Sequence, residues 1–243
     1  HHGAVRHAAE EAMGEVEFFV GRAFTQRRVR VQLPSFRGLA ARVLAVSLVF
    51  SVCSAQEVRA GEKVLSEALG FSIELPEGWI RMSADSFYKN LGRVRFNDEE
   101  FQKALAKHAS VPALVATKHP EPYEDINPSI KLNVRPYGNL PSKEPLEIIS
   151  FIVVPLKRVF KDLKVVTGPE RVLVNGQNAA HLVVEYTLQS EAGDFPTASE
   201  LWIVPTQHFF FMIGVGYKQG ETADAEVATT AVRSFNLLGV SQQ

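Results

Sequence analysis

The alternation of apolar and polar positions is clearest in segments that predict half-buried strands. In Gly70-Phe-Ser-Ile-Glu-Leu-Pro-Glu-Gly-Trp79, three apolar residues alternate with Ser and Glu ahead of a Pro-Glu-Gly turn. Residues 129–135 alternate in the same way, and residues 113–118 form a shorter apolar run. A period of two is typical of strands that bury one face, so all three segments are expected in a sheet.

Apolar residues at helical spacing predict three helices. The first begins at the capping-box pattern Asn97-Asp-Glu-Glu100 and ends at Pro112. The second is expected to begin at Ser142 as its N-cap and to keep its apolar face as far as Leu163. Pro155 lies inside this second helix and is expected to kink it.

The third helix is expected to begin at Thr222 and to end at Ser234-Phe235. Its buried side is predicted to carry Val227, Ala228, Ala231 and Val232.

Between the second and third helices the chain reads as a series of strands. Asn175-Gly176 is a strong hairpin signal because both residues tolerate a positive φ, and strands are expected over 171–174 and 179–188 on either side of it. Two more are expected over 198–204 and 208–217. Residues 209–215 are almost all apolar, which is typical of a central strand covered on both faces. Hairpins with interspersed helices predict an α+β fold around an antiparallel sheet.

The first sixty residues differ from the rest of the chain in charge. They hold eight Arg, no Lys and five acidic residues, which leaves 18 basic and 22 acidic residues in 61–243. Behind Arg42 the ten apolar or small residues 43–52 match the core of a secretory signal and are too short to span a bilayer. A buried hydrophobic helix is the alternative. Small residues suit cleavage after Ala55 or Ala60.

This pattern divides the chain into three parts. Residues 1–36 are expected to be an unstructured extension or a gene-start artefact, residues 37–60 a signal peptide, and residues 61–243 one domain. We therefore expect a secreted or periplasmic protein, with the thylakoid lumen or a lipid-anchored envelope location as alternatives. Cys53 is the only cysteine, so an internal disulfide is excluded. Val52 precedes it where a lipoprotein signal needs a small residue, which favours cleavage over lipidation at Cys53.

Several segments of the mature region are similar to the PsbP-like superfamily, which includes Mog-type proteins and bacterial periplasmic relatives. They are the 70–79 segment, Val172-Leu-Val-Asn-Gly-Gln177 before a long hairpin, and Val232-Arg-Ser-Phe235 after an aromatic strand. The resemblance spans about residues 70–236. It implies an αβα sandwich around an antiparallel sheet and a protein that binds other proteins or assists assemblies. No family site residue is carried over.

Sequence motifs of catalysis are missing from the chain. There is no G-x-S-x-G, P-loop or H-E-x-x-H pattern, and the formal net charge of −1 gives no basic field for nucleic acid. One loop concentrates possible metal ligands, although three prolines interrupt them and a solvated acidic loop is favoured. These candidate ligands are His119, Glu121, Glu124 and Asp125. No cofactor is expected.

Three hypotheses of function follow. The leading one is a secreted, non-enzymatic PsbP-like domain that binds a protein partner or supports an envelope assembly through loops such as 119–128 and 189–196. The second is a periplasmic protein that binds a small ligand or a metal through the 119–125 acids. The third is a hydrolase with a dispersed site, which would require a cleft where a histidine and carboxylates converge. Membrane contact is expected through the signal peptide alone or, less favoured, through lipidated Cys53.

Overall fold

The apolar run at residues 209–215 forms the middle of a large antiparallel sheet, as the sequence predicts. In the computed structural model, which describes residues 61–82, 94–95, 112–190 and 192–239, this run belongs to β10 (Phe209–Lys218). The strand lies between β6 (Ser129–Pro136) and β9 (Gly193–Pro205), and every residue except its two ends is buried. A strand with paired neighbours on both sides and cover on both faces needs apolar residues at every position.

The sheet extends outward from β10 in both directions through antiparallel pairs. Beyond β6 come β5 (Leu114–Thr117) and then the short β3 (Ile80–Arg81). Beyond β9 comes β8 (Gln177–Ser190), which pairs along most of its length with β7 (Lys161–Val174) and at its end with β4 (Val94–Arg95). Among the described residues the large sheet therefore has eight strands.

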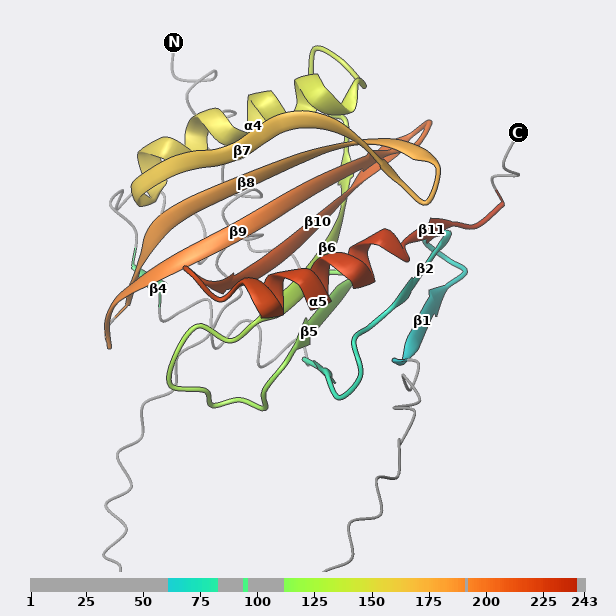
Figure 1. Ribbon diagram of the computed structural model, residues 1–243. Helices are drawn as coiled ribbons and strands as arrows, with labels where there is room; N and C mark the ends of the chain where they lie inside the picture. Colours follow the sequence, from blue (N-terminus) through green and yellow to red (C-terminus); the bar gives the residue numbers. More distant parts are fainter. Residues whose placement is uncertain (1–60, 83–93, 96–111, 191, 240–243) are drawn as a thin grey trace, which may run out of the picture. The chain divides into compact units, whose positions relative to one another are not determined.

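The two faces of this sheet are covered by different elements (Figure 1). Helix α4 (Pro145–Val159) packs on one face, against β7, β8 and β9. Helix α5 (Thr222–Arg233) packs on the other face, next to a small sheet of β1 (Lys63–Ser66), β2 (Phe71–Glu74) and β11 (Asn236–Leu237). The predicted α+β class and the αβα sandwich around an antiparallel sheet are therefore confirmed.

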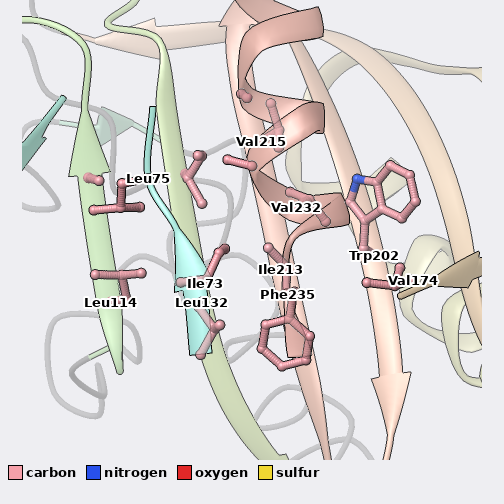
Figure 2. Packing of buried hydrophobic residues seen from close by; sticks show 14 of the residues in the cluster. Ile73, Leu75, Leu114, Leu132, Val174, Trp202, Ile213, Val215, Val232 and Phe235 are labelled. Carbon is pink, nitrogen blue, oxygen red and sulfur yellow. The ribbon is translucent and has the colours of Figure 1, made fainter. Parts of the chain in front are cut away.

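A separate apolar core fills each side of the sheet. On the α4 side, Ile149, Ile152 and Leu156 of the helix meet Leu182 and Met212 of the strands. On the α5 side, shown in Figure 2, the sheet residues meet α5, β2 and the residue after α5. The residues labelled there are Ile73, Leu75, Leu114, Leu132, Val174, Trp202, Ile213, Val215, Val232 and Phe235.

Three phenylalanines join the elements of the α5-side core. Phe71 of β2, Phe211 of β10 and Phe235 after α5 are each at most 1% exposed. Their ring centroids lie 5.5 Å apart for Phe71–Phe211, 5.8 Å for Phe71–Phe235 and 5.1 Å for Phe211–Phe235. These separations are typical of favourable aromatic pairs, so the three rings connect the small sheet, the large sheet and the end of α5.

The two described helices differ from prediction at particular residues. Ser142 does not hold the N-cap position of α4, which Glu144 occupies; the Ser142 hydroxyl instead accepts a hydrogen bond from the Glu144 N–H. Leu163, predicted at the end of this helix, lies in β7. In α5, Val227 is 47% exposed, and Ala225 takes its place on the buried side.

Strand β7 begins ten residues earlier than the sequence predicts, at Lys161 rather than Arg171. Its first part is charged and carries Gly168-Pro169, and its register against β8 shifts three times before Glu170. These shifts destroy the clean alternation that predicts a strand. The apolar face of α4 also continues in phase as far as Leu163, which packs on the same core from β7, so the predicted helix was too long.

Several predictions lie outside the described residues. They are the extension at 1–36, the signal peptide at 37–60 with Cys53, and the helix between Asn97 and Pro112. In the part of the chain that the structure describes, neither helix has the length and apolar character needed to cross a membrane.

Candidate functional site

A histidine held between two carboxylates lies on the α5 face of the sheet. His181 of β8 contacts Glu170 of β7 through Nδ1, at 3.1 Å to Oε1, and Glu200 of β9 through Nε2, at 3.1 Å to Oε2. The hairpin register places Glu170 directly opposite His181, and Glu200 lies two residue pairs further along, opposite Val183 and on the same face of the sheet. Side chains on neighbouring strands are close enough at these positions to contact one another.

Glu200 extends this arrangement to two further elements. Its Oε2 also accepts a hydrogen bond from Thr229 Oγ1 of α5 at 3.1 Å, and its Oε1 accepts a longer one from the Tyr217 hydroxyl of β10 at 3.5 Å. We call these five residues the His181 cluster: Glu170, His181, Glu200, Tyr217 and Thr229. The cluster therefore connects four strands and one helix through polar groups.

Glu200 and His181 are largely buried, so the hydrogen bonds of the His181 cluster are important for stability. Glu200 is 7% exposed, and the His181 side chain is 12% exposed. Burying a carboxylate costs free energy unless other groups donate hydrogen bonds to it. His181 and the Thr229 hydroxyl supply those donors, whereas Glu170 is half exposed and remains in contact with water.

The hydrogen-bond pattern limits the chemistry open to His181. A neutral imidazole has one N–H, whereas the imidazolium has two, so the cationic ring is the form that donates to both carboxylates. A general base in nucleophilic catalysis needs a ring nitrogen that is free to accept a proton. Both nitrogens of His181 face carboxylates. The cluster brings together a histidine and two acids, as the hydrolase hypothesis requires, but in an arrangement suited to structural support.

A shallow depression lies next to the cluster. His181 packs against Trp202 of β9, with ring centroids 4.1 Å apart, and Trp202 contributes to the depression. The volume of this depression is about 520 Å³. We call it the Trp202 depression; its lining residues are Arg171, Val172, Leu173, Asn178, Trp202 and Arg233.

The Trp202 depression combines a buried aromatic residue with exposed ones. Trp202 is 4% exposed and lies in the core, as predicted, whereas Leu173 at the edge of the sheet is 65% exposed. Val172 and Trp202 point to the α5 side of the sheet, toward Arg233 in the last turn of α5, whereas the side chains of Arg171 and Leu173 alternate onto the α4 side, where Arg171 pairs with Glu144. Helices and strands thus supply all six lining residues, which gives the depression a rigid frame.

The four predicted metal ligands lie in one loop, and three of them contact other residues of the loop or of β10. Glu121 accepts hydrogen bonds from the Tyr123 N–H and from Asn127 Nδ2, both within the loop. The His119 ring stacks on Tyr123, with centroids 4.5 Å apart, and Glu124 is exposed. Asp125 pairs with Lys218 of β10. Among the described residues no group of three or more His, Cys, Asp or Glu side chains could hold a metal ion.

The ion pair with Lys218 helps to lower the pKa of Asp125. Partial burial raises the pKa of the Asp125 carboxyl, but hydrogen bonds from Lys218 and from the Ile126 N–H outweigh burial, and the net pKa lies below its ordinary value. A lowered native-state pKa means that the pair contributes stability above about pH 4, and that this contribution is lost as the pH falls and the carboxyl protonates.

We therefore expect Lys218→Met to raise the pKa of Asp125, because burial remains while the main compensating donor is removed. A ¹³C NMR titration of the Asp125 carboxyl measures this change directly. Lys161→Met is the matched control, since Lys161 pairs with Asp194 instead. An Asp125 pKa that is unchanged in Lys218→Met would show that this ion pair is not formed in solution.

The second loop expected to bind a partner, 189–196, is mostly strand. β8 continues to Ser190, β9 begins at Gly193, and these two residues pair with each other, so most of the expected loop belongs to the sheet. Sequence reasoning placed His181 in a strand, which is correct, but did not connect it with Glu170 or Glu200. It also missed the depression beside Trp202. One available signal was the Asn175-Gly176 turn, whose two-residue hairpin pairs Val174 with Gln177 and therefore Glu170 with His181.

Comparison with known proteins finds likeness in structure and none in sequence. No family model matches the chain, and no curated protein matches it significantly. Among solved structures, LpqN, described as involved in cell envelope biogenesis of Mycobacterium tuberculosis, is 13% identical with a TM-score of 0.44. The match covers 73% of this chain and 90% of LpqN. A structure from Bacteroides thetaiotaomicron is 14% identical at a TM-score of 0.44, and the match covers 75% of this chain but only half of that one.

Two further neighbours are of the PsbP and Mog types that the sequence resembles. The cyanobacterial PsbP of Synechocystis sp. PCC 6803 is 11% identical at a TM-score of 0.44, over 76% of this chain and 96% of its own. The Ran-binding protein Mog1p of Saccharomyces cerevisiae is 12% identical at a TM-score of 0.41, over 73% and 95%. Both neighbours are of types that the resemblance in the sequence names, and no function is taken from them.

Proposed function

We propose that this chain is a non-enzymatic binding domain that docks a protein partner on the Trp202 depression. The observation that carries the proposal is the make-up of this surface. Tryptophan and arginine are enriched among residues that dominate binding energy in protein interfaces, where they lie in pockets surrounded by less important contacts. Here Trp202 lines a depression on the α5 side of the sheet that also presents Val172 and the exposed Arg233.

The frame of the depression supports the same function. Its residues lie on β7, β8, β9 and α5, and the His181 cluster ties strands β7 to β10 to α5 directly beside Trp202. A binding surface held on rigid elements loses less conformational entropy when a partner binds than one built on loops. In this account the His181 cluster supports the binding surface and takes no part in catalysis.

The proposed location is outside the cytoplasm, where the partner would belong to an envelope assembly. This part of the proposal is supported by the sequence of residues 37–60, with its arginine flank, apolar core and small residues near Ala55 and Ala60.

Substitution of Arg233 tests the proposed binding function. Arg233→Glu reverses the charge of an exposed side chain that lines the depression, so folding is expected to be preserved. Arg158→Glu is the matched control, because Arg158 is an exposed arginine in the last turn of α4 and does not line the depression. Affinity-tagged full-length chains are purified from the native cells, and co-purified proteins are quantified by mass spectrometry.

We expect a protein that co-purifies with the unaltered chain and with Arg158→Glu, and whose recovery falls at least about tenfold with Arg233→Glu. A partner recovered equally with both variants would contradict docking on the depression. Circular dichroism of the two variants establishes that both are folded before the comparison is made.

A further inference from the structure

Strand β7 lies at an edge of the large sheet. Among the described residues it pairs with β8 alone, and Figure 1 shows it on the side of β8 away from β9. Every second residue of an edge strand directs its N–H and C=O groups away from the sheet. These groups can form with an added strand the same hydrogen bonds that strands inside the sheet form with one another.

The Asn175-Gly176 turn determines which residues of β7 face outward. Both residues of this turn have a positive φ, 46° and 78°, as in a two-residue type I′ turn. Such a turn makes Val174 and Gln177 a hydrogen-bonded pair, and the register has no shift between this pair and Arg171. Hydrogen-bonded pairs alternate along an antiparallel hairpin, so the N–H and C=O groups of Arg171 and Leu173 point away from β8.

The stretch from Arg171 to Leu173 is accessible and regular. Leu173 is 65% exposed and the Arg171 side chain is 67% exposed. The ion pair of Arg171 with Glu144 uses the side chain, so the backbone groups of Arg171 are not involved in it. In contrast, the earlier part of β7 carries three register shifts and Pro169, features that obstruct pairing at a sheet edge. An added strand can therefore use the 171–173 stretch.

The Trp202 depression lies against this same stretch of β7. Arg171, Val172 and Leu173 all line it, although their side chains alternate between the two faces of the sheet. A depression that touches three consecutive residues of a strand lies beside the backbone of that strand, and not only beside one row of side chains. The depression therefore joins the edge of the sheet to the α5-side surface around Trp202.

Building on the proposed binding function, we infer that the partner protein adds an extended segment to the large sheet as an antiparallel strand beside residues 171–173. Backbone groups of the segment pair with the outward N–H and C=O groups of Arg171 and Leu173. The segment residue opposite Val172 enters the depression on the α5 side, and its neighbour opposite Leu173 packs on the α4 side. Both are expected to be apolar, because Val172 and Leu173 are apolar. Two copies of this chain paired about Val172 would instead place Arg171 opposite Leu173, which favours a different segment.

A phage-displayed library of random linear peptides, selected on the unaltered full chain, supplies segments for the test. Selected peptides are synthesised with a fluorescent label, and their affinities are measured by anisotropy. Each peptide is also made with a single N-methyl group on successive residues, which removes one backbone N–H and keeps the side chain. On the chain, Leu173→Pro removes the outward N–H, and proline is tolerated in an edge strand where the N–H faces solvent. Leu173→Val is the matched control that keeps this N–H and an apolar side chain.

We expect peptides with two consecutive apolar residues and no proline beside them. N-methylation should weaken binding about tenfold or more at the two residues opposite Arg171 and Leu173, and by much less at the residue between them. Leu173→Pro should weaken binding by a similar factor, and Leu173→Val by less than about threefold. Amide hydrogen exchange of Arg171 and Leu173, followed by NMR in the unaltered chain, should slow about tenfold or more when a peptide is bound.

The remaining outcomes separate this inference from the proposed function. Peptides that tolerate every N-methyl group and bind Leu173→Pro normally, but bind Arg233→Glu at least about tenfold more weakly, would overturn strand addition and leave docking of side chains in the depression. Selection of no peptide, or of peptides that bind both Leu173→Pro and Arg233→Glu normally, would overturn both. A dimer of the unaltered chain in sedimentation velocity that Leu173→Pro dissociates would overturn the inference in favour of a second copy on this edge.

Discussion

Replacing Phe211 with alanine is expected to lower the free energy of unfolding by about 3–5 kcal/mol, a large part of what holds a domain of this size folded. Phe211 is fully buried in the central strand β10 and contacts the rings of Phe71, Phe235 and Phe209. The substitution removes these contacts and leaves a cavity where three elements meet. Equilibrium unfolding in urea, followed by circular dichroism, measures the change.

Phe151→Ala is the control for this prediction. Phe151 lies on α4 and is 43% exposed, so its truncation is expected to cost about 1 kcal/mol or less. Equal losses of stability from Phe211→Ala and Phe151→Ala would contradict the placement of the core around β10.

His181→Ala is expected to have the second large effect, a loss of about 3–5 kcal/mol. Removing the imidazole leaves the buried Glu200 carboxylate with the hydroxyl groups of Thr229 and Tyr217 as its side-chain donors. The unpaired charge, and not the loss of packing alone, accounts for most of the expected cost. Chemical denaturation at neutral pH measures this loss.

Two further variants distinguish a buried charge pair from ordinary packing at His181. Glu170→Ala should cost less than about 1 kcal/mol, since this carboxylate is half exposed. The double variant His181→Leu with Glu200→Leu should be more stable than His181→Ala, because it leaves no buried carboxyl group without its imidazole partner. A double variant that is less stable than the single one would show that packing dominates at this position.

The elements that the sequence predicts well are those with a clean period. β2 alternates, β10 is apolar throughout, and α4 repeats every three or four residues, and each of these patterns is a direct consequence of the face or faces that the element buries. The first half of β7 was not predicted because its register shifts keep any regular period from forming. An irregular edge strand can pair with its neighbour in the sheet although its sequence has no repeating pattern.

The candidate site was harder to predict because it depends on pairings between strands. Glu170 and His181 are 11 residues apart, and only the register of the Asn175-Gly176 hairpin places them in contact. Glu200 and Trp202 join them through a second hairpin, whose turn after Ser190 carries no comparable signal. In contrast, His119 and its acidic neighbours are close in sequence, which made them an obvious candidate, yet backbone turns and ion pairs already occupy Glu121 and Asp125.

The most direct test of the central claim is site-specific photo-crosslinking in living cells. A photoreactive phenylalanine analogue is introduced at Arg233, in the depression, or at Arg158, on α4. Irradiation is predicted to attach one defined partner protein to the chain labelled at position 233, with no such adduct from position 158. No adduct from position 233, or the same adduct from both positions, would contradict docking of a protein on the Trp202 depression.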